Sequence, residues 1–220
     1  MLETVVRFFQ EGGPFMYPIA IVLAIGLAIT IERFVYLASV RRRNRLAFEK
    51  GILPLLRKRD YQRAMKAAAG SDSAIATIMS AGISRLLNNH PREDVEYAME
   101  EGLMEVLPRL EKRTQYLATL ANIATLLGLL GTIIGLIAAF TAVAAADPSQ
   151  KATLLSESIS VAMNTTAFGL MSAIPLLMFH ALLQTRTNEI VDSFEMAGVK
   201  LLNIISEQAS PSSSPGQSAA

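Results

Sequence analysis

Two stretches of the chain place hydroxyl and small side chains on one helical face, inside segments that contain no charged residue. The members of these faces are Thr125, Gly128, Thr132, Gly135 and Ala139 in the first stretch, and Ser158, Ala162, Thr166, Gly169 and Ala173 in the second. Successive steps of three and four residues put each set on one side of an α-helix. Because a hydroxyl both donates and accepts a hydrogen bond, two such faces could line a narrow path for a proton or a desolvated cation.

The same residues allow a purely structural interpretation. Small side chains let helices approach closely in a membrane, and Gly131 with Gly135 forms the small-xxx-small pattern typical of such contacts. The residues that either pack helices or line a pore are Gly128, Gly131, Gly135, Ala162, Gly169 and Ala173. The candidate ion-pathway residues are Thr132 and Thr166, with Thr125, Asn164 and Thr165 as further polar groups.

The chain lacks the residues that most enzyme mechanisms and metal sites need. The chain has no Cys and only two His, so thiol chemistry and the common metal sites are excluded, and no cofactor is expected. It shows no nucleophile with a base and no phosphate-binding glycine loop, which favours a protein that is not an enzyme. The formal net charge of +1 gives no reason to expect a nucleic-acid partner. A passive membrane scaffold is the alternative to an ion pathway.

The segments that must position these residues are long and apolar. Hydrophobic residues make up 51% of the chain and charged residues 18%, and Gly12–Ile31, Thr114–Ala146 and Ser158–Thr185 hold no charge. About 20 apolar helical residues cross the hydrocarbon core of a bilayer. The pattern predicts an all-α membrane protein with transmembrane helices at residues 16–40, 114–146 and 157–185, in preference to a soluble bundle.

None of these segments carries a carboxylate near its middle. Glu32 stands beside Arg33 near the end of the first segment, where we expect the two to form an interfacial ion pair. An ion that crosses the membrane here would therefore need an ionisable carrier from another chain.

The distribution of Lys and Arg predicts how the chain is oriented. Residues 41–113 hold 15 of the 20 basic residues and begin with an arginine cluster. By the positive-inside rule this segment is a cytoplasmic helical domain, while residues 1–15 and the loop 147–156 are periplasmic. Residues 186–208 are predicted to form a cytoplasmic C-terminal helix, and residues 209–220 a disordered tail. One long helix is expected over residues 92–145, with Pro108 as the place for a kink.

Two motifs are more specific than the periodicity. Gly128-Leu-Leu-Gly-Thr132 in the second apolar segment and Thr166-Ala-Phe-Gly-Leu170 in the third resemble the span signatures of the MotA/TolQ/ExbB proton-channel family. The start of the first span, Gly13-Pro-Phe-Met-Tyr-Pro18, is similar too. The resemblance covers roughly residues 10–190. A short chain with three spans is more similar to ExbB and TolQ than to the four-span MotA.

The resemblance implies partners and a mechanism. Members of the family form a homopentamer in the lipid bilayer of the bacterial inner membrane, around a dimer of single-span proteins of the ExbD or TolR type. An Asp of the partner carries the proton, and the family's pore threonines fall on Thr132 and Thr166. The partner's periplasmic part transmits force. The resemblance therefore implies a stator subunit that couples proton flow to mechanical work.

Two positions depart from the family's pattern. Val161 stands where ExbB and TolQ usually carry Glu, and Thr125 follows Ala124 where the family usually has Pro. The missing acid and the additional polar groups leave sodium open as an alternative to the proton. Which machine is driven, whether nutrient uptake, envelope constriction or motility, depends on the partner chain.

Overall fold

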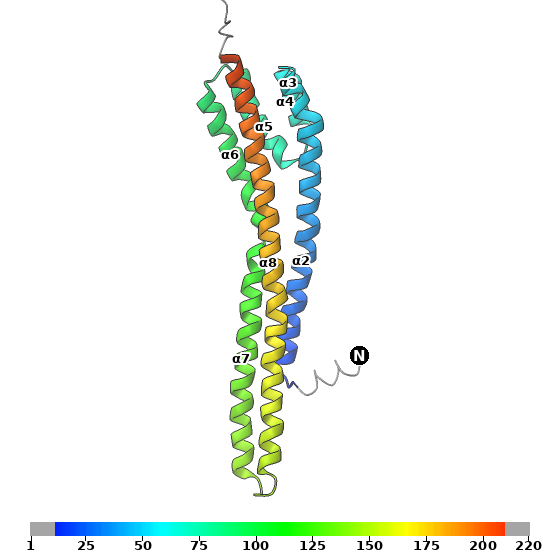
Figure 1. Cartoon of the computed structure of the whole chain (residues 1–220), viewed down its shortest axis with the longest axis vertical. Helices are drawn as coiled ribbons and strands as arrows, with labels where there is room; N and C mark the ends of the chain where they lie inside the picture. The colour runs from blue at the N-terminus through cyan, green and yellow to red at the C-terminus, as the bar shows by residue number, and fades with distance from the viewer. Residues whose placement is uncertain (1–11, 210–220) are drawn as a thin grey trace, which may run out of the picture. The chain divides into compact units, whose positions relative to one another are not determined.

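The computed structural model describes residues 12–209, and within them every regular element is a helix. These elements are α2 (Met16–Arg45), the π-helical η1 (Leu46–Ile52), α3 (Leu53–Arg57), α4 (Tyr61–Ala69), α5 (Ala74–Leu87), α6 (Arg92–Glu111), α7 (Thr114–Ala145) and α8 (Lys151–Ala209) (Figure 1). The predicted all-α fold is confirmed. Residues 1–11 of the predicted N-terminal segment and residues 210–220 of the predicted disordered tail lie outside the described part.

Three helical stretches are long and apolar enough to cross a membrane. Their most apolar windows have mean hydropathies of 2.0, 2.4 and 1.8, and only 22–28% of each window is buried within the chain. On α7, for example, Leu126, Ile137 and Phe140 are 61–64% exposed. Large apolar side chains that remain uncovered in such numbers need lipid or another protein around them. The helices therefore make this a membrane protein.

The third stretch is one continuous helix. α8 begins at Lys151 and runs to Ala209 with Pro175 inside it, so the predicted third span and the predicted C-terminal helix belong to one element. Because α7 ends at Ala145, the connection between the two helices is residues 146–150, shorter than the predicted loop 147–156.

The expected single helix over residues 92–145 is wrong, because the chain leaves the helix at Lys112 and Arg113. Arg113 has a φ of 68°, a left-handed conformation that interrupts an α-helix. Its guanidinium donates to both carboxylate oxygens of Glu32 at 2.7 Å. In the structure Glu32 therefore pairs with Arg113, which lies 81 residues further along the chain. The predicted kink site, Pro108, lies within α6, which continues to Glu111.

Residues 35–112 and the described part of the chain from residue 185 form a compact unit of their own. Its core includes Met79 of α5 with Phe194 and Leu201 of α8, which are at most 1% exposed. Gly82 allows α5 and α6 to approach, since a Cβ there would lie 2.6 Å from Cγ of Met99. This unit is a small helical bundle with a packed interior.

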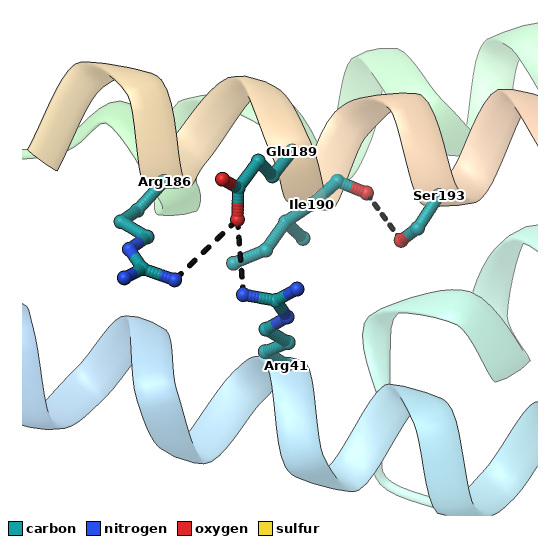
Figure 2. A network of polar contacts seen from close by, with 5 residues as sticks. All are labelled: Arg41, Arg186, Glu189, Ile190 and Ser193. Atoms are coloured by element: carbon teal, nitrogen blue, oxygen red, sulfur yellow. Dashed lines mark hydrogen bonds and ion pairs between the residues drawn. The ribbon is translucent and has the colours of Figure 1, made fainter.

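An ion-pair network joins α2 to α8 within this unit (Figure 2). Arg41 Nη1 donates to Glu189 Oε2 at 2.9 Å, and Arg186 Nη1 lies 3.6 Å from the same oxygen. One helical turn further on, the hydroxyl of Ser193 donates to the carbonyl of Ile190 at 2.6 Å. Because the charged side chains are 41–57% exposed, such pairs orient the helices more than they stabilise them.

Candidate functional site

Small residues form the contact between α7 and the first half of α8, which run antiparallel within the unit of residues 12–34 and 113–184 (Figure 1). A Cβ added at Gly128 would lie 3.2 Å from Cα of Gly169, and a Cβ at Gly135 would lie 2.9 Å from Cβ of Ala162. A Cβ at Gly131 would overlap the side chain of Thr165. The structure thus brings the small residues of the two candidate faces into direct contact within one chain, as close helix packing requires.

Thr132 of α7 and Thr166 of α8 meet beside this contact. Their hydroxyl oxygens lie 3.4 Å apart, which is long for a hydrogen bond between hydroxyls. Thr166 donates instead to the carbonyl of Gly128 at 2.8 Å, and Thr132 donates to the carbonyl of Leu129 at 2.6 Å. Each hydroxyl has one proton, so both protons are directed at backbone carbonyls. The pair, which is half-buried, is left with lone pairs that can accept hydrogen bonds from a further group.

Thr165 has different surroundings from this pair. It is 2% exposed, and its hydroxyl lies 2.6 Å from the carbonyl of Gly12 and 2.9 Å from that of Val161. The contact with Gly12 ties α8 to the turn that precedes α2. The hydroxyl is enclosed by the chain itself, which is the arrangement of a packing residue.

The other predicted residues are spread over the same helices. Thr125 is exposed, donates to the carbonyl of Ala121 at 3.1 Å, and lies two turns before Thr132 on the same face of α7. Asn164 is half-exposed and lies two residues from Thr166, which places it on a different face of α8. Ala173 is 3% exposed. The structure therefore brings together only Thr132 and Thr166 among the predicted polar residues.

Val161 occupies a place next to the turn before α2. Its Cγ1 would lie 3.1 Å from a Cβ at Gly13, which has a φ of 74°. The side chain is half-buried and lies one helical turn from Thr165. The position at which the family's pattern usually has Glu therefore holds an apolar side chain that lies against the turn before α2.

Sequence reasoning missed Ser172. The residue is fully buried in α8, and its hydroxyl has no hydrogen-bond partner within the described chain. Because Ser172 lies six residues after Thr166, it is not on the helical face that the steps of three and four residues define.

No group of three or more His, Cys, Asp or Glu that could hold a metal occurs among residues 12–209.

Comparison with known proteins identifies a family whose model matches this part of the chain. The model of a family described as "MotA/TolQ/ExbB proton channel family" matches residues 70–196, a range that contains both Thr132 and Thr166. The chain is also 28% identical over 194 residues to a biopolymer transport protein ExbB homolog of Methanothermobacter thermautotrophicus. That alignment covers 88% of this chain and 67% of the relative.

Proposed function

Because this chain belongs to the MotA/TolQ/ExbB proton channel family, we propose that it is the multi-span stator subunit of an ion-driven motor in the bacterial inner membrane. In this proposal it forms a pentamer around a dimer of single-span, Asp-bearing partners and couples proton flow to mechanical work on the periplasmic side. One observation carries the proposal: the hydroxyls of Thr132 and Thr166 meet half-buried in helices that hold no charge around them.

The hydrogen bonds of the pair favour one protonation state of a carrier. A protonated carboxylic acid can donate its O–H to the lone pairs of Thr132 or Thr166, because both hydroxyl protons are held by carbonyls. An ionised carboxylate at the same place would find no donor and would remain desolvated, which is costly. The pair therefore accepts the neutral acid and disfavours the carboxylate. A carrier must take up its proton before it enters and release the proton when it leaves.

The cytoplasmic helices support assembly into an oligomer. Tyr97 and Met104 on α6 are 67% and 70% exposed, although they lie outside the charge-free segments that lipid would cover. They share a face of the helix with three carboxylates, those of Glu93, Glu100 and Glu101. Exposed aromatic and Met side chains are typical of protein interfaces. The arginine cluster after the first span supports a cytoplasmic position for this unit.

Sodium is the second candidate ion. Hydroxyl lone pairs beside backbone carbonyls are ligands that a dehydrated cation accepts. The proton is the better candidate, since the described spans carry no carboxylate near their middle that could balance a bound cation.

Reconstitution with the partner chain tests the proposal. Thr132→Val and Thr166→Val remove a hydroxyl at nearly constant shape, and we expect each to reduce proton flux into liposomes at least about tenfold while the complex stays assembled. Thr141→Val is the matched control, because Thr141 is exposed on the opposite face of α7 and donates only to Ile137. Full proton flux in both pathway variants would support a scaffold, and flux of sodium alone would reassign the ion.

A further inference from the structure

A polar recess lies in the unit of residues 35–112 and 185–209, between α2, the start of α5 and the end of α6. Its volume is about 210 Å³. The buried side chains in its wall include those of Val40, Asn44 and Leu110. Its rim carries two arginines and two carboxylates: Arg43, Arg109, Asp72 and Glu105. Among the described residues, none of these four side chains forms an ion pair.

Asn44 has a donor that the chain itself leaves unused. The residue is 3% exposed, and its Oδ1 accepts a hydrogen bond from the backbone N–H of Ile75 at 3.3 Å. That bond fixes the orientation of the amide, because Nδ2 cannot accept from an N–H. The buried Nδ2 has no partner in the described chain. Such donors are uncommon in folded proteins, and because Asn44 lines this recess, its Nδ2 is a candidate donor to a bound group.

The start of α5 contributes to the same recess. Ser73 and Ala74, at the beginning of this helix, line it together with Thr77. The N–H groups of Ile75, Ala76 and Thr77 already have acceptors within the chain, so this helix end contributes mainly the positive end of its dipole, which favours an anion. Together with Asn44 Nδ2 and the two arginines, it suits a phosphate group. The carboxylates of Asp72 and Glu105 on the same rim suit an ammonium group instead.

The recess adjoins the apolar segments along the sequence. Val40 is the last residue of the predicted first span and is followed by the arginine cluster, and Leu110 lies four residues before Thr114, where the second span begins. Residues at the ends of membrane spans lie at the level of the lipid head groups. A phospholipid can therefore bring both charges of its head group to this place.

We propose that the recess binds the head group of a phospholipid that carries both a phosphate and a primary ammonium, as phosphatidylethanolamine does. The phosphate accepts hydrogen bonds from Asn44 Nδ2 and the two arginines beside the positive end of the α5 dipole, and the ammonium group meets the two carboxylates. The inference rests on the membrane position of the helices and not on ion conduction. The two proposals can therefore fail independently.

Native mass spectrometry of the full chain, with its partners in detergent, tests the site. Phosphatidylethanolamine, phosphatidylglycerol and phosphatidylcholine with identical acyl chains are added to the wild type and to Arg109→Gln and Asn44→Asp. The aspartate keeps an acceptor for the N–H of Ile75 while it removes the amide donor. Arg42→Gln is the control, because Arg42 is exposed next to Arg43 but does not line the recess. Circular dichroism on heating shows whether each variant is folded, and Arg109→Gln alone carries the test if Asn44→Asp is not.

We expect phosphatidylethanolamine to be retained at about tenfold lower concentration than the other two lipids, and each recess variant to weaken retention by a similar factor. Arg42→Gln should behave as wild type. Asp72→Asn with Glu105→Gln should abolish the preference over phosphatidylglycerol, a change that a merely structural role would not produce. Wild-type retention in a folded recess variant, or an equal loss in Arg42→Gln, would overturn the site. Displacement by inorganic phosphate as effective as by O-phosphoethanolamine would overturn the lipid as its ligand.

Discussion

The hydroxyl of Thr165 in the first half of α8 donates a 2.6 Å hydrogen bond to the carbonyl of Gly12, which precedes α2. The bond is buried and joins residues 153 positions apart. Because Thr165 also touches Gly131 of α7, one side chain holds the start of the first membrane helix against the other two. The neighbouring hydroxyl of Thr166 remains half-exposed. Adjacent threonines thus serve packing and the candidate pathway separately.

Thr165→Val should therefore affect stability more than ion flux. The substitution preserves the shape of the side chain but leaves the carbonyl of Gly12 without its donor, at a cost of about 1 kcal/mol. We expect a lower midpoint of thermal unfolding in detergent and an unchanged proton flux for each assembled complex. Thr125→Val, which removes an exposed hydroxyl, should leave the midpoint unchanged. A loss of flux without a loss of stability would place Thr165 in the pathway.

The contact between Gly128 and Gly169 should not tolerate a methyl group. A Cβ at Gly169 would lie 2.8 Å from the carbonyl oxygen of Ala124 and 3.0 Å from Cα of Gly128, so α7 and α8 would have to separate. We expect Gly169→Ala to destabilise the chain by about 1–3 kcal/mol, the usual cost of overpacking. Gly51→Ala is the control, because no atom lies within 4 Å of the added Cβ and Ala favours a helix. Equal midpoints for the two variants would contradict the close packing.

Most of this architecture can be predicted from the sequence, because the features that indicate the helices depend on residues close together along the chain. Missing charges mark the membrane helices, and steps of three and four residues place Thr132 and Thr166 on the faces that meet. The left-handed conformation of Arg113 could not be predicted in this way, since Arg has no preference for it and the stabilising partner is the distant Glu32. The burial of the Thr165 hydroxyl could not be predicted either, because it depends on a hydrogen bond to Gly12, which is distant in the sequence.

The ion pair of Glu32 and Arg113 should help to orient the start of α7 against α2, within the unit of residues 12–34 and 113–184. Both side chains are 47% exposed, so the attraction between them is screened and orientation is its main effect. We expect Arg113→Gly, which fits the left-handed conformation but lacks the charge, to preserve the helix content. The distance between spin labels on α2 and α7, both placed in the unit of residues 12–34 and 113–184, should become more broadly distributed. A distribution as narrow as that of the wild type would show that the ion pair does not orient the two helices.

The exposed face of α6 should contribute to assembly. Tyr97→Ser with Met104→Ser removes apolar area that is 67–70% exposed, so the fold of the single chain should change little. If the face packs against a neighbouring subunit, light scattering in detergent should show dissociation to smaller species at low protein concentration. Glu96→Gln is the control at the edge of this face. An intact oligomer in the serine variant at every concentration would assign the face to something other than the neighbouring copy.

Replacing Val161 with Glu tests whether an acid at this position takes part in ion transfer. Val161 lies five residues before Thr166, about 7.5 Å along α8, so a long side chain there can approach the pathway. We expect Val161→Glu to alter coupling, seen as a new pH dependence of proton flux, with the oligomer intact. The contact with Gly13 will be crowded by any long side chain, so Val161→Gln is the necessary control. Because Gln has nearly the same size and no titratable proton, a new pH dependence in Glu alone would come from ionisation. Identical flux profiles for the two variants would mean that ionisation at this position takes no part in ion transfer.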